Sequence, residues 1–186
     1  RIYHGADVFW AEYRAQPDLE TALQSLSVEQ LAGSAFPSAP FESPMPLGKL
    51  VLPALRWTLR RHTLPDDEPT RYLFRSFILS ANSIAQEFAR CLDDTAKRFS
   101  AAPTTAVIFN GIMYPEASAR WIAQQRGLRV VTHEVSFQRF SSFFTDGEAT
   151  AYPIHIPEDF ELGAEQNARL DAYLEKRFQG QFTMAG

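Results

Sequence analysis

Apolar residues recur at every third or fourth position between Thr70 and Phe99, and this is the strongest periodic pattern in the sequence. Charged and amide side chains occupy the positions between them. This spacing predicts one amphipathic helix of about 45 Å, at roughly 1.5 Å per residue, with its apolar stripe against a core. The stripe consists of Phe74, Phe77, Ile78, Ala81, Ala85, Phe88, Leu92 and Phe99.

Weaker helical patterns come before this helix. Short helices are predicted between residues 18 and 32, and a longer one between residues 47 and 64, interrupted near Pro53. The proline-rich stretch at residues 34–46 predicts a loop. Residues 1–69 therefore form a helical and loop portion in this interpretation.

A strand, a helix and a second strand are predicted between Thr105 and Glu134. Residues 105–109 and 128–132 are short apolar runs of the kind that is buried in parallel sheets. A turn, a proline suited to the first turn of a helix and a glycine suited to its end lie between the two runs. This βαβ pattern predicts that the two strands are parallel neighbours.

The remainder of the chain is predicted to be irregular at residues 136–150, with a third strand at 152–156 and a final helix at 164–178. Together the elements predict a single Rossmann-like α/β domain over residues 1–186. Its largely parallel sheet is flanked by helices, and its N-terminal portion is helical. Because the chain starts with Arg1 rather than methionine and neither end resembles a tag, we interpret it as a fragment of a longer protein.

Composition narrows the possible partners and compartment. A formal net charge of −4 provides no broad cationic surface, which argues against nucleic acid. Cys91 is the single cysteine, so the sequence has no multi-cysteine metal site and fits a reducing compartment. The sequence has no transmembrane run and no signal peptide, so we expect a cytoplasmic protein. The four histidines lack metal-ligand spacing, and we predict neither a metal nor a cofactor.

Ligands of open parallel sheets bind beyond the carboxyl ends of the strands, which selects residues 110–114 and 133–136. Outward-facing amides at the start of the following helix suit carboxylate, phosphate or sugar hydroxyl groups. The alternative is that Asn110-Gly111 only forms a turn. The predicted substrate-binding residues are Asn110, Gly111, Met113, Tyr114 and Ser136.

Glu134 is the candidate catalytic residue, because an apolar strand brings its carboxylate to the sheet edge, where it can act as a general base. The alternative is a solvated acid. His133 is interpreted as a packing residue. The basic group Arg56, Arg60 and Arg61 is interpreted first as a solvated helix end and second as an anion or phospholipid contact. The sequence lacks the GxGxxG, GxxxxGK[ST], GxSxG and HExxH motifs, which argues against dehydrogenase and P-loop chemistry.

The run Val-Ile-Phe-Asn-Gly, the later Pro115 and Gly127, the strand that ends in Glu134 and the late Tyr-Leu-Glu-Lys-Arg-Phe-Gln-Gly resemble a known family. They are similar to the N-terminal half of bacterial cell-surface polysaccharide glycosyltransferases of the capsule and O-antigen type. These enzymes have the GT-B architecture of two Rossmann-like halves. The similarity is most specific over residues 105–134 and only topological before residue 99.

This resemblance implies that the chain supplies the acceptor side of an inter-domain cleft, with a sugar or glycolipid acceptor. A missing C-terminal domain would then bind the nucleotide-sugar donor, and the fragment alone would be inactive. It implies no metal and a location at the inner face of the cell membrane, with peripheral association. Two alternatives stay open: a non-catalytic sugar- or partner-binding module of a surface-assembly protein, and a different nucleotide-binding α/β transferase.

Overall fold

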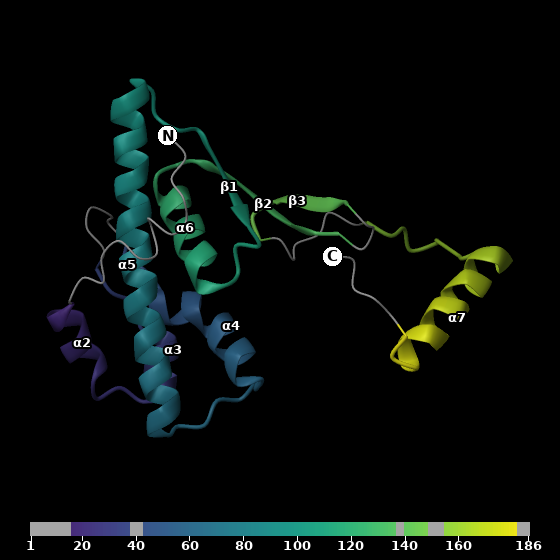
Figure 1. Cartoon of the computed structure of the whole chain (residues 1–186), viewed down its shortest axis with the longest axis horizontal. Coiled ribbons are helices and arrows are strands. Elements are labelled where there is room, and N and C mark those ends of the chain that lie inside the picture. Colours follow the sequence, from purple (N-terminus) through teal and green to yellow (C-terminus); the bar gives the residue numbers. More distant parts are fainter. Residues whose placement is uncertain (1–15, 38–42, 137–139, 149–154, 182–186) are drawn as a thin grey trace.

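The structure is a computed structural model that describes residues 16–37, 43–136, 140–148 and 155–181. Within these ranges a helical body lies beside a small sheet, and one helix extends away from both (Figure 1). The elements, in chain order, are α2 (Pro17–Leu23), α3 (Val28–Gly33), α4 (Leu47–Leu59), α5 (Glu68–Phe99), β1 (Thr105–Phe109), α6 (Tyr114–Gln125), β2 (Arg129–Val135), β3 (Ser142–Asp146) and α7 (Ala164–Phe178).

The predicted long helix is confirmed as α5, and it is the axis of the helical body. Asp67 caps its start, because the carboxylate accepts a hydrogen bond from the Thr70 amide at 2.9 Å. Its apolar stripe packs against a core, and it does so mainly through α4 and α6. Phe88 is the contact between the helical core and the smaller core under the sheet. The far end of the stripe differs from the expectation, since Phe99 is 65% exposed.

The short helices α3 and α4 are held close together beside α5. Gly48 makes this approach possible, because a Cβ at this position would lie 1.9 Å from the Leu31 carbonyl oxygen. Asp66 ties α3 to the start of α5, since its carboxylate accepts bonds from the Arg71 guanidinium at 2.7 Å and the Val28 amide at 2.9 Å. These bonds, that from Arg71 first, lower the pKa of Asp66 to about 2. Helix α4 continues through Pro53 and ends earlier than predicted.

The sheet has the order β1-β2-β3 and is mixed. Strands β1 and β2 are parallel, with Thr105 opposite Arg129 and Phe109 opposite His133, as the βαβ pattern predicted. Strand β3 pairs antiparallel with β2. The expectation of a largely parallel sheet is therefore wrong in this respect: residues 142–146, expected to be irregular, form an antiparallel edge strand. The coarser class, a mixed α/β fold with helices beside the sheet, is confirmed.

Helix α6 covers one face of the sheet, and α5 lies behind it (Figure 1). Ala106, Ile108 and Val130 are buried on this face against Ala123 of α6. Among the described residues the opposite face lacks such a cover, and it exposes large apolar side chains. These are Val107, Phe109, Val135 and Phe144, which are 47% to 63% exposed.

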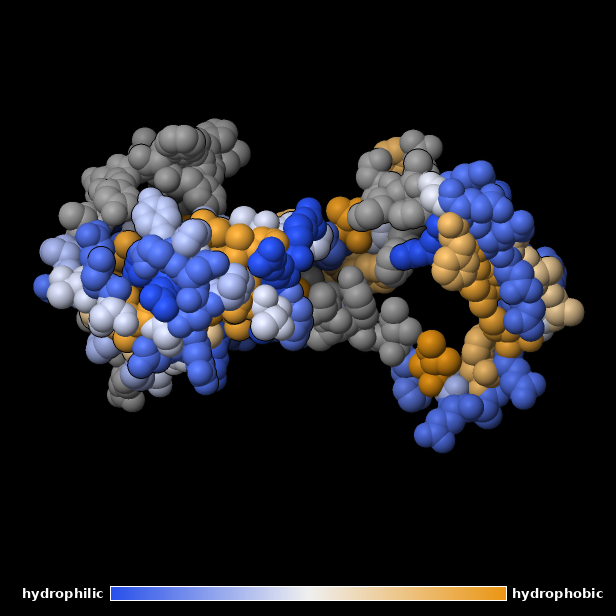
Figure 2. Space-filling view, turned by 90° about the horizontal axis from the view of Figure 1, so that it is seen from below, coloured by the Kyte–Doolittle hydropathy of each residue, from blue (hydrophilic) through white to orange (hydrophobic). Residues whose placement is uncertain are grey.

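The predicted final helix is confirmed as α7, but it buries none of its residues against the described part of the chain. Leu170 and Tyr173 are among its exposed large side chains. Figure 2 shows an orange, hydrophobic stripe on the right-hand part of the molecule, where Figure 1 places α7. The strand predicted at 152–156 lies largely outside the described residues, and residues 155 and 156 are not in a strand. None of the described helices combines the length and the apolar character needed to cross a membrane.

Candidate functional site

The turn after β1 brings the first half of the site to the carboxyl edge of the sheet. Asn110 and Gly111 both adopt positive φ, at 57° and 77°, which asparagine and glycine tolerate better than other residues. The Asn110 amide donates to the His133 carbonyl at 2.8 Å, so the turn is attached to β2 at the last residue that pairs with β1. This bond fixes the turn beside Glu134.

Asn110 and Glu134 form a direct side-chain pair across the two parallel strands. The Asn110 Nδ2 donates to Glu134 Oε2 at 2.6 Å, and the Asn110 Oδ1 accepts from the Ile112 amide at 3.0 Å. A backbone N–H can only donate, so the Ile112 bond identifies which atom of the Asn110 amide is the oxygen and leaves its NH₂ group for the carboxylate. The asparagine thus positions the carboxylate relative to the turn.

The sequence suggested that Glu134 follows the end of the strand at residues 128–132. In the structure it lies inside β2. Beyond His133 the strand loses β1 as a partner and continues against β3 alone, with Glu134 opposite Phe143. The side chain is half-buried on the same face as the buried Thr132. Its second oxygen, Oε1, accepts a hydrogen bond from the Val135 amide at 2.9 Å. Each carboxylate oxygen has a further lone pair, so the group can still accept a bond from a ligand hydroxyl.

Residues on α6 and β2 that the sequence did not single out support the turn. Arg120 donates from Nε to the Gly111 carbonyl at 3.0 Å and from its terminal nitrogen to Glu148 at 2.7 Å. The buried Thr132 hydroxyl donates to the Gly147 carbonyl at 2.7 Å. An arginine on a helix and a threonine in a strand carry no sequence signal of this kind, because the contacts depend on how β3 pairs.

Gly111 provides a test of how tightly the turn is packed. A Cβ on Gly111 would lie 2.8 Å from Thr132 Cγ2, whereas a Cβ on Gly127 has nothing within 4 Å; both residues have φ above 70°. Replacing Gly127 with alanine therefore adds backbone strain only, about 1 kcal/mol. We expect Gly111→Ala to lower the free energy of unfolding by roughly 2 to 4 kcal/mol, because overpacking adds to the strain. Chemical denaturation measures both, and equal losses would contradict the packing argument.

The other predicted site residues do not all join the pair. Met113 is the N-terminal cap of α6 and lines a pocket at the end of α4. Tyr114 packs its ring on Phe77 of α5, with centroids 4.9 Å apart, and burial followed by the nearby Glu116 raises the pKa of its hydroxyl. Ser136 follows β2, and its amide donates to the Ser141 carbonyl. The structure thus brings Asn110, Gly111 and Glu134 together and distributes the remaining three around them.

Glu116, in the first turn of α6, is a second acid near this edge that sequence analysis did not select. It is half-buried, and desolvation raises the pKa of its carboxyl above the ordinary value. A raised carboxyl pKa is a feature of general acids and bases. Its position after Pro115 in a first helical turn indicates only a favourable helix start, which is why the sequence gave no functional signal.

His133 is a packing residue, as predicted. Its ring lies between Phe109 and Phe144 on the open face of the sheet, with centroids 5.4 and 5.8 Å away. It therefore points to the face opposite Glu134. In the part of the chain that the structure describes, no three His, Cys, Asp or Glu side chains are grouped so as to hold a metal ion.

Comparisons of the chain with protein family models, with curated proteins and with solved structures give no match. The class that the fold and site define is a mixed α/β domain with a hydrogen-bonded asparagine and glutamate at the carboxyl edge of a parallel strand pair. Any more specific function depends on the chemistry of this edge.

Proposed function

We propose that the chain is the acceptor-side domain of a GT-B-type glycosyltransferase that acts in bacterial surface polysaccharide synthesis. In this proposal a second domain binds the nucleotide-sugar donor, and Glu134 faces the cleft between the two. The acceptor is a sugar or glycolipid, and transfer takes place at the cytoplasmic face of the membrane.

The observation that carries the proposal is the Asn110–Glu134 pair. Its bond of 2.6 Å links the turn after β1 to the next-to-last residue of β2, at the carboxyl edge of the parallel strand pair, which is where open α/β sheets bind ligands. The carboxylate is half-buried and is held by two donors, so its orientation is fixed before any ligand arrives. Preorganised groups of this kind lower the cost of reaching the transition state.

The chemistry assigned to Glu134 is general base catalysis. The carboxylate accepts the proton of an acceptor hydroxyl while that oxygen forms a bond to the anomeric carbon of the donor sugar. The bond between this carbon and the leaving phosphate oxygen breaks, and the electron pair leaves with the nucleotide. Asn110 keeps the carboxylate in place and does not itself take part in proton transfer.

A non-catalytic sugar- or partner-binding module is the second candidate. It is favoured by the fact that both oxygens of Glu134 already accept internal hydrogen bonds, so the pair can also serve only to join the two strands. A different nucleotide-binding α/β transferase is the third. The domain that accompanies this one in the complete gene product discriminates between them: a second nucleotide-sugar-binding domain supports the transferase, and a repeat array supports the module.

Donor binding tests which half of the enzyme this chain represents. We expect the 186-residue chain to bind UDP-, GDP- and CMP-sugars no more tightly than the millimolar range, because the proposal assigns the donor site to the other domain. Isothermal titration calorimetry with a panel of these nucleotide-sugars measures this. The complete gene product serves as the control and should bind one of them about a hundredfold more tightly. Micromolar binding by the 186-residue chain would overturn the acceptor-side assignment.

A further inference from the structure

A second feature of the molecule is a cluster of cations at the end of α4. The helix ends at Leu59, and Arg60 takes the left-handed conformation with φ of 53°. The Arg61 amide then bonds to the Arg56 carbonyl at 3.1 Å, which turns the chain sharply across the end of the helix. Three of the chain's 18 lysines and arginines are thereby concentrated within six positions, in a protein of net charge −4.

These cations surround an open pocket with a volume of about 460 Å³. Arg56, Arg60, Arg61 and His62 line it together with three apolar residues. No acidic residue lines this pocket among the described residues. It is therefore strongly cationic on one side and apolar on the other.

The charge in this pocket is not neutralised by ion pairs within the described residues. Arg56 is half-buried, and its Nε is enclosed without a hydrogen-bond partner in the described structure. Asp67 is the acid that interacts electrostatically with Arg61, but its carboxylate is hydrogen-bonded to Thr70 at the start of α5. Among the described residues the guanidinium groups thus retain donors that can bind a ligand.

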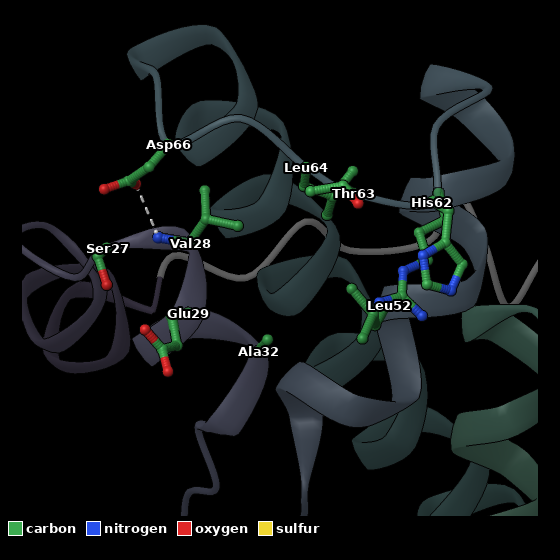
Figure 3. A pocket seen from close by; sticks show the side chains of 10 residues that line it. Ser27, Val28, Glu29, Ala32, Leu52, His62, Thr63, Leu64 and Asp66 are labelled. Atoms are coloured by element: carbon green, nitrogen blue, oxygen red, sulfur yellow. Dashed lines mark hydrogen bonds between the residues drawn. The ribbon is translucent and has the colours of Figure 1, made fainter.

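A neighbouring pocket of about 360 Å³ shares Arg56 and His62 and contains acidic residues (Figure 3). Figure 3 shows that Asp66 and Glu29 lie toward one end of this pocket, whereas His62 lies at the other end beside Leu52. Asp66 is also already bonded to Arg71 and to the Val28 amide. The acids of the neighbouring pocket therefore do not neutralise the cationic one.

The apolar wall consists of Pro53, Trp57 and Met113. The Arg60 guanidinium stacks over the Trp57 ring at 4.3 Å from its centroid, which limits the rotamers of the arginine and holds its donors in place. Trp57 is nevertheless 60% exposed, although it is the largest side chain of the helix. Exposing a large apolar side chain to water is unfavourable, and a ligand that covers the ring would remove this penalty. The wall suits the weakly polar part of a ligand whose charged part contacts the arginines.

We propose that this pocket binds the phosphoryl group of an organic phosphate, with the attached group against Trp57 and Met113. Arginine forks match phosphate oxygens in a bidentate geometry, which a chloride ion cannot provide. A phosphate also carries more negative charge and more acceptor oxygens than a carboxylate, which favours it where several cations converge. A structural alternative is that the cations only offset the negative end of the α4 dipole. That end carries about half an elementary charge, whereas three guanidinium groups carry three, so most of the positive charge is left for a ligand.

The inference goes beyond the proposed function and does not depend on it, since it concerns binding and not transfer. The two sites are nevertheless close along the chain, because Met113 follows Asn110 by three residues and caps α6 at the same edge of the sheet.

The test is an NMR titration of the ¹⁵N-labelled chain with inorganic pyrophosphate and with glucose 1-phosphate. Three charge-assisted contacts, each contributing about tenfold, give a dissociation constant on the order of 1 mM. We expect saturable chemical shift changes at the Met113 amide and at the Arg56 and Arg60 side chains, and we expect added salt to weaken the binding.

In a second arm, sedimentation compares vesicles of phosphatidylglycerol with vesicles of phosphatidylcholine. Binding to the soluble phosphates identifies a free phosphate ligand, and binding to phosphatidylglycerol vesicles alone identifies a lipid headgroup; either supports the proposal.

Arg98 supplies a matched control for Arg60. It also lies at a helix C-terminus, stacks on a neighbouring aromatic ring at 5.8 Å and is exposed, but it does not line this pocket. We expect Arg60→Gln and Arg56→Gln each to weaken phosphate binding about tenfold, and Arg98→Gln to leave it unchanged. Circular dichroism confirms that each variant is folded. No binding in either arm, or equal weakening by Arg60→Gln and Arg98→Gln, would overturn the proposal.

Discussion

On the proposed function, replacing Glu134 with glutamine is expected to reduce sugar transfer by the complete gene product about a hundred- to ten-thousand-fold, the range for loss of a positioned general base. Glutamine is close in size, and its carbonyl oxygen can still accept the bond from Asn110. Its NH₂ group, however, then faces the Val135 amide, which donates to the carboxylate in the native protein. We therefore expect a loss of only about 1 kcal/mol in the free energy of unfolding, from one broken hydrogen bond.

Transfer of labelled sugar from the nucleotide-sugar to acceptor extracted from cells measures the effect, and thermal unfolding confirms that the variant is folded. Glu116→Gln is the matched variant, since it removes the other half-buried carboxylate near the edge. We expect it to retain most of the activity. If Glu116→Gln abolishes transfer while Glu134→Gln does not, the base is Glu116, and the Asn110–Glu134 pair has a structural role. Near wild-type rates for both variants would show that neither Glu134 nor Glu116 is the general base.

The elements that local pattern alone determines were predicted well. Helix α5 and helix α7 show clear helical periodicity, and the strands β1 and β2 are apolar runs separated by turn and cap residues. Their identity follows from residues that lie close together in the sequence. Helix α4 shows where this reasoning is too cautious: Pro53 predicted an interruption, but neighbouring helices hold the segment in a helical conformation despite the lost hydrogen bond.

Strand β3 was missed because its formation depends on a partner and not on its own pattern. Residues 142–146 alternate poorly, with Phe143 and Phe144 adjacent and only Thr145 buried. Once β3 pairs with β2, residues 134 and 135 also become strand, which places Glu134 one step inside the sheet. Non-local pairing of this kind cannot be deduced from short-range spacing.

The candidate site was predicted in part for the same reason. The rule that parallel strands end at one edge of the sheet was enough to predict that Asn110 and Glu134 lie close together. The positions of the Met113 and Tyr114 side chains could not be predicted, because they depend on how α6 packs against α4 and α5. Arg56, Arg60 and Arg61, interpreted first as a solvated helix end, instead line a pocket with Met113. Their convergence depends on the left-handed turn at Arg60, which no sequence motif marks.

The open face of the sheet explains why the Rossmann-like prediction holds only at the coarser level of a mixed α/β fold. In doubly wound proteins helices cover both faces of the parallel strands. Here α6 and α5 lie on one side, and Val107 and Phe109 are exposed on the other among the described residues. A three-stranded sheet with one covered face is compatible with several α/β topologies.

Replacing Phe74 with alanine is expected to cause a large loss of stability, because Phe74 lies in the helical core. Phe74 has no exposed surface and lies in the core to which α3, α4, α5 and α6 contribute. Removing its ring leaves a cavity that rigid helices fill only in part, so we expect the free energy of unfolding to fall by about 3 to 5 kcal/mol. Denaturant unfolding monitored by circular dichroism measures the change.

Phe99 is the matched control, because it belongs to the same predicted stripe and the same helix but is 65% exposed. Phe99→Ala should change the free energy of unfolding by no more than about 0.5 kcal/mol, as for other surface substitutions. The pair separates two explanations of the stripe. If periodicity alone determined burial, the two substitutions would cost the same. If burial depends on which part of α5 has helices packed against it, Phe74→Ala is costly and Phe99→Ala is not. Similar losses for both would indicate that Phe99 is covered in the folded protein, for example by another domain or a second copy of the chain.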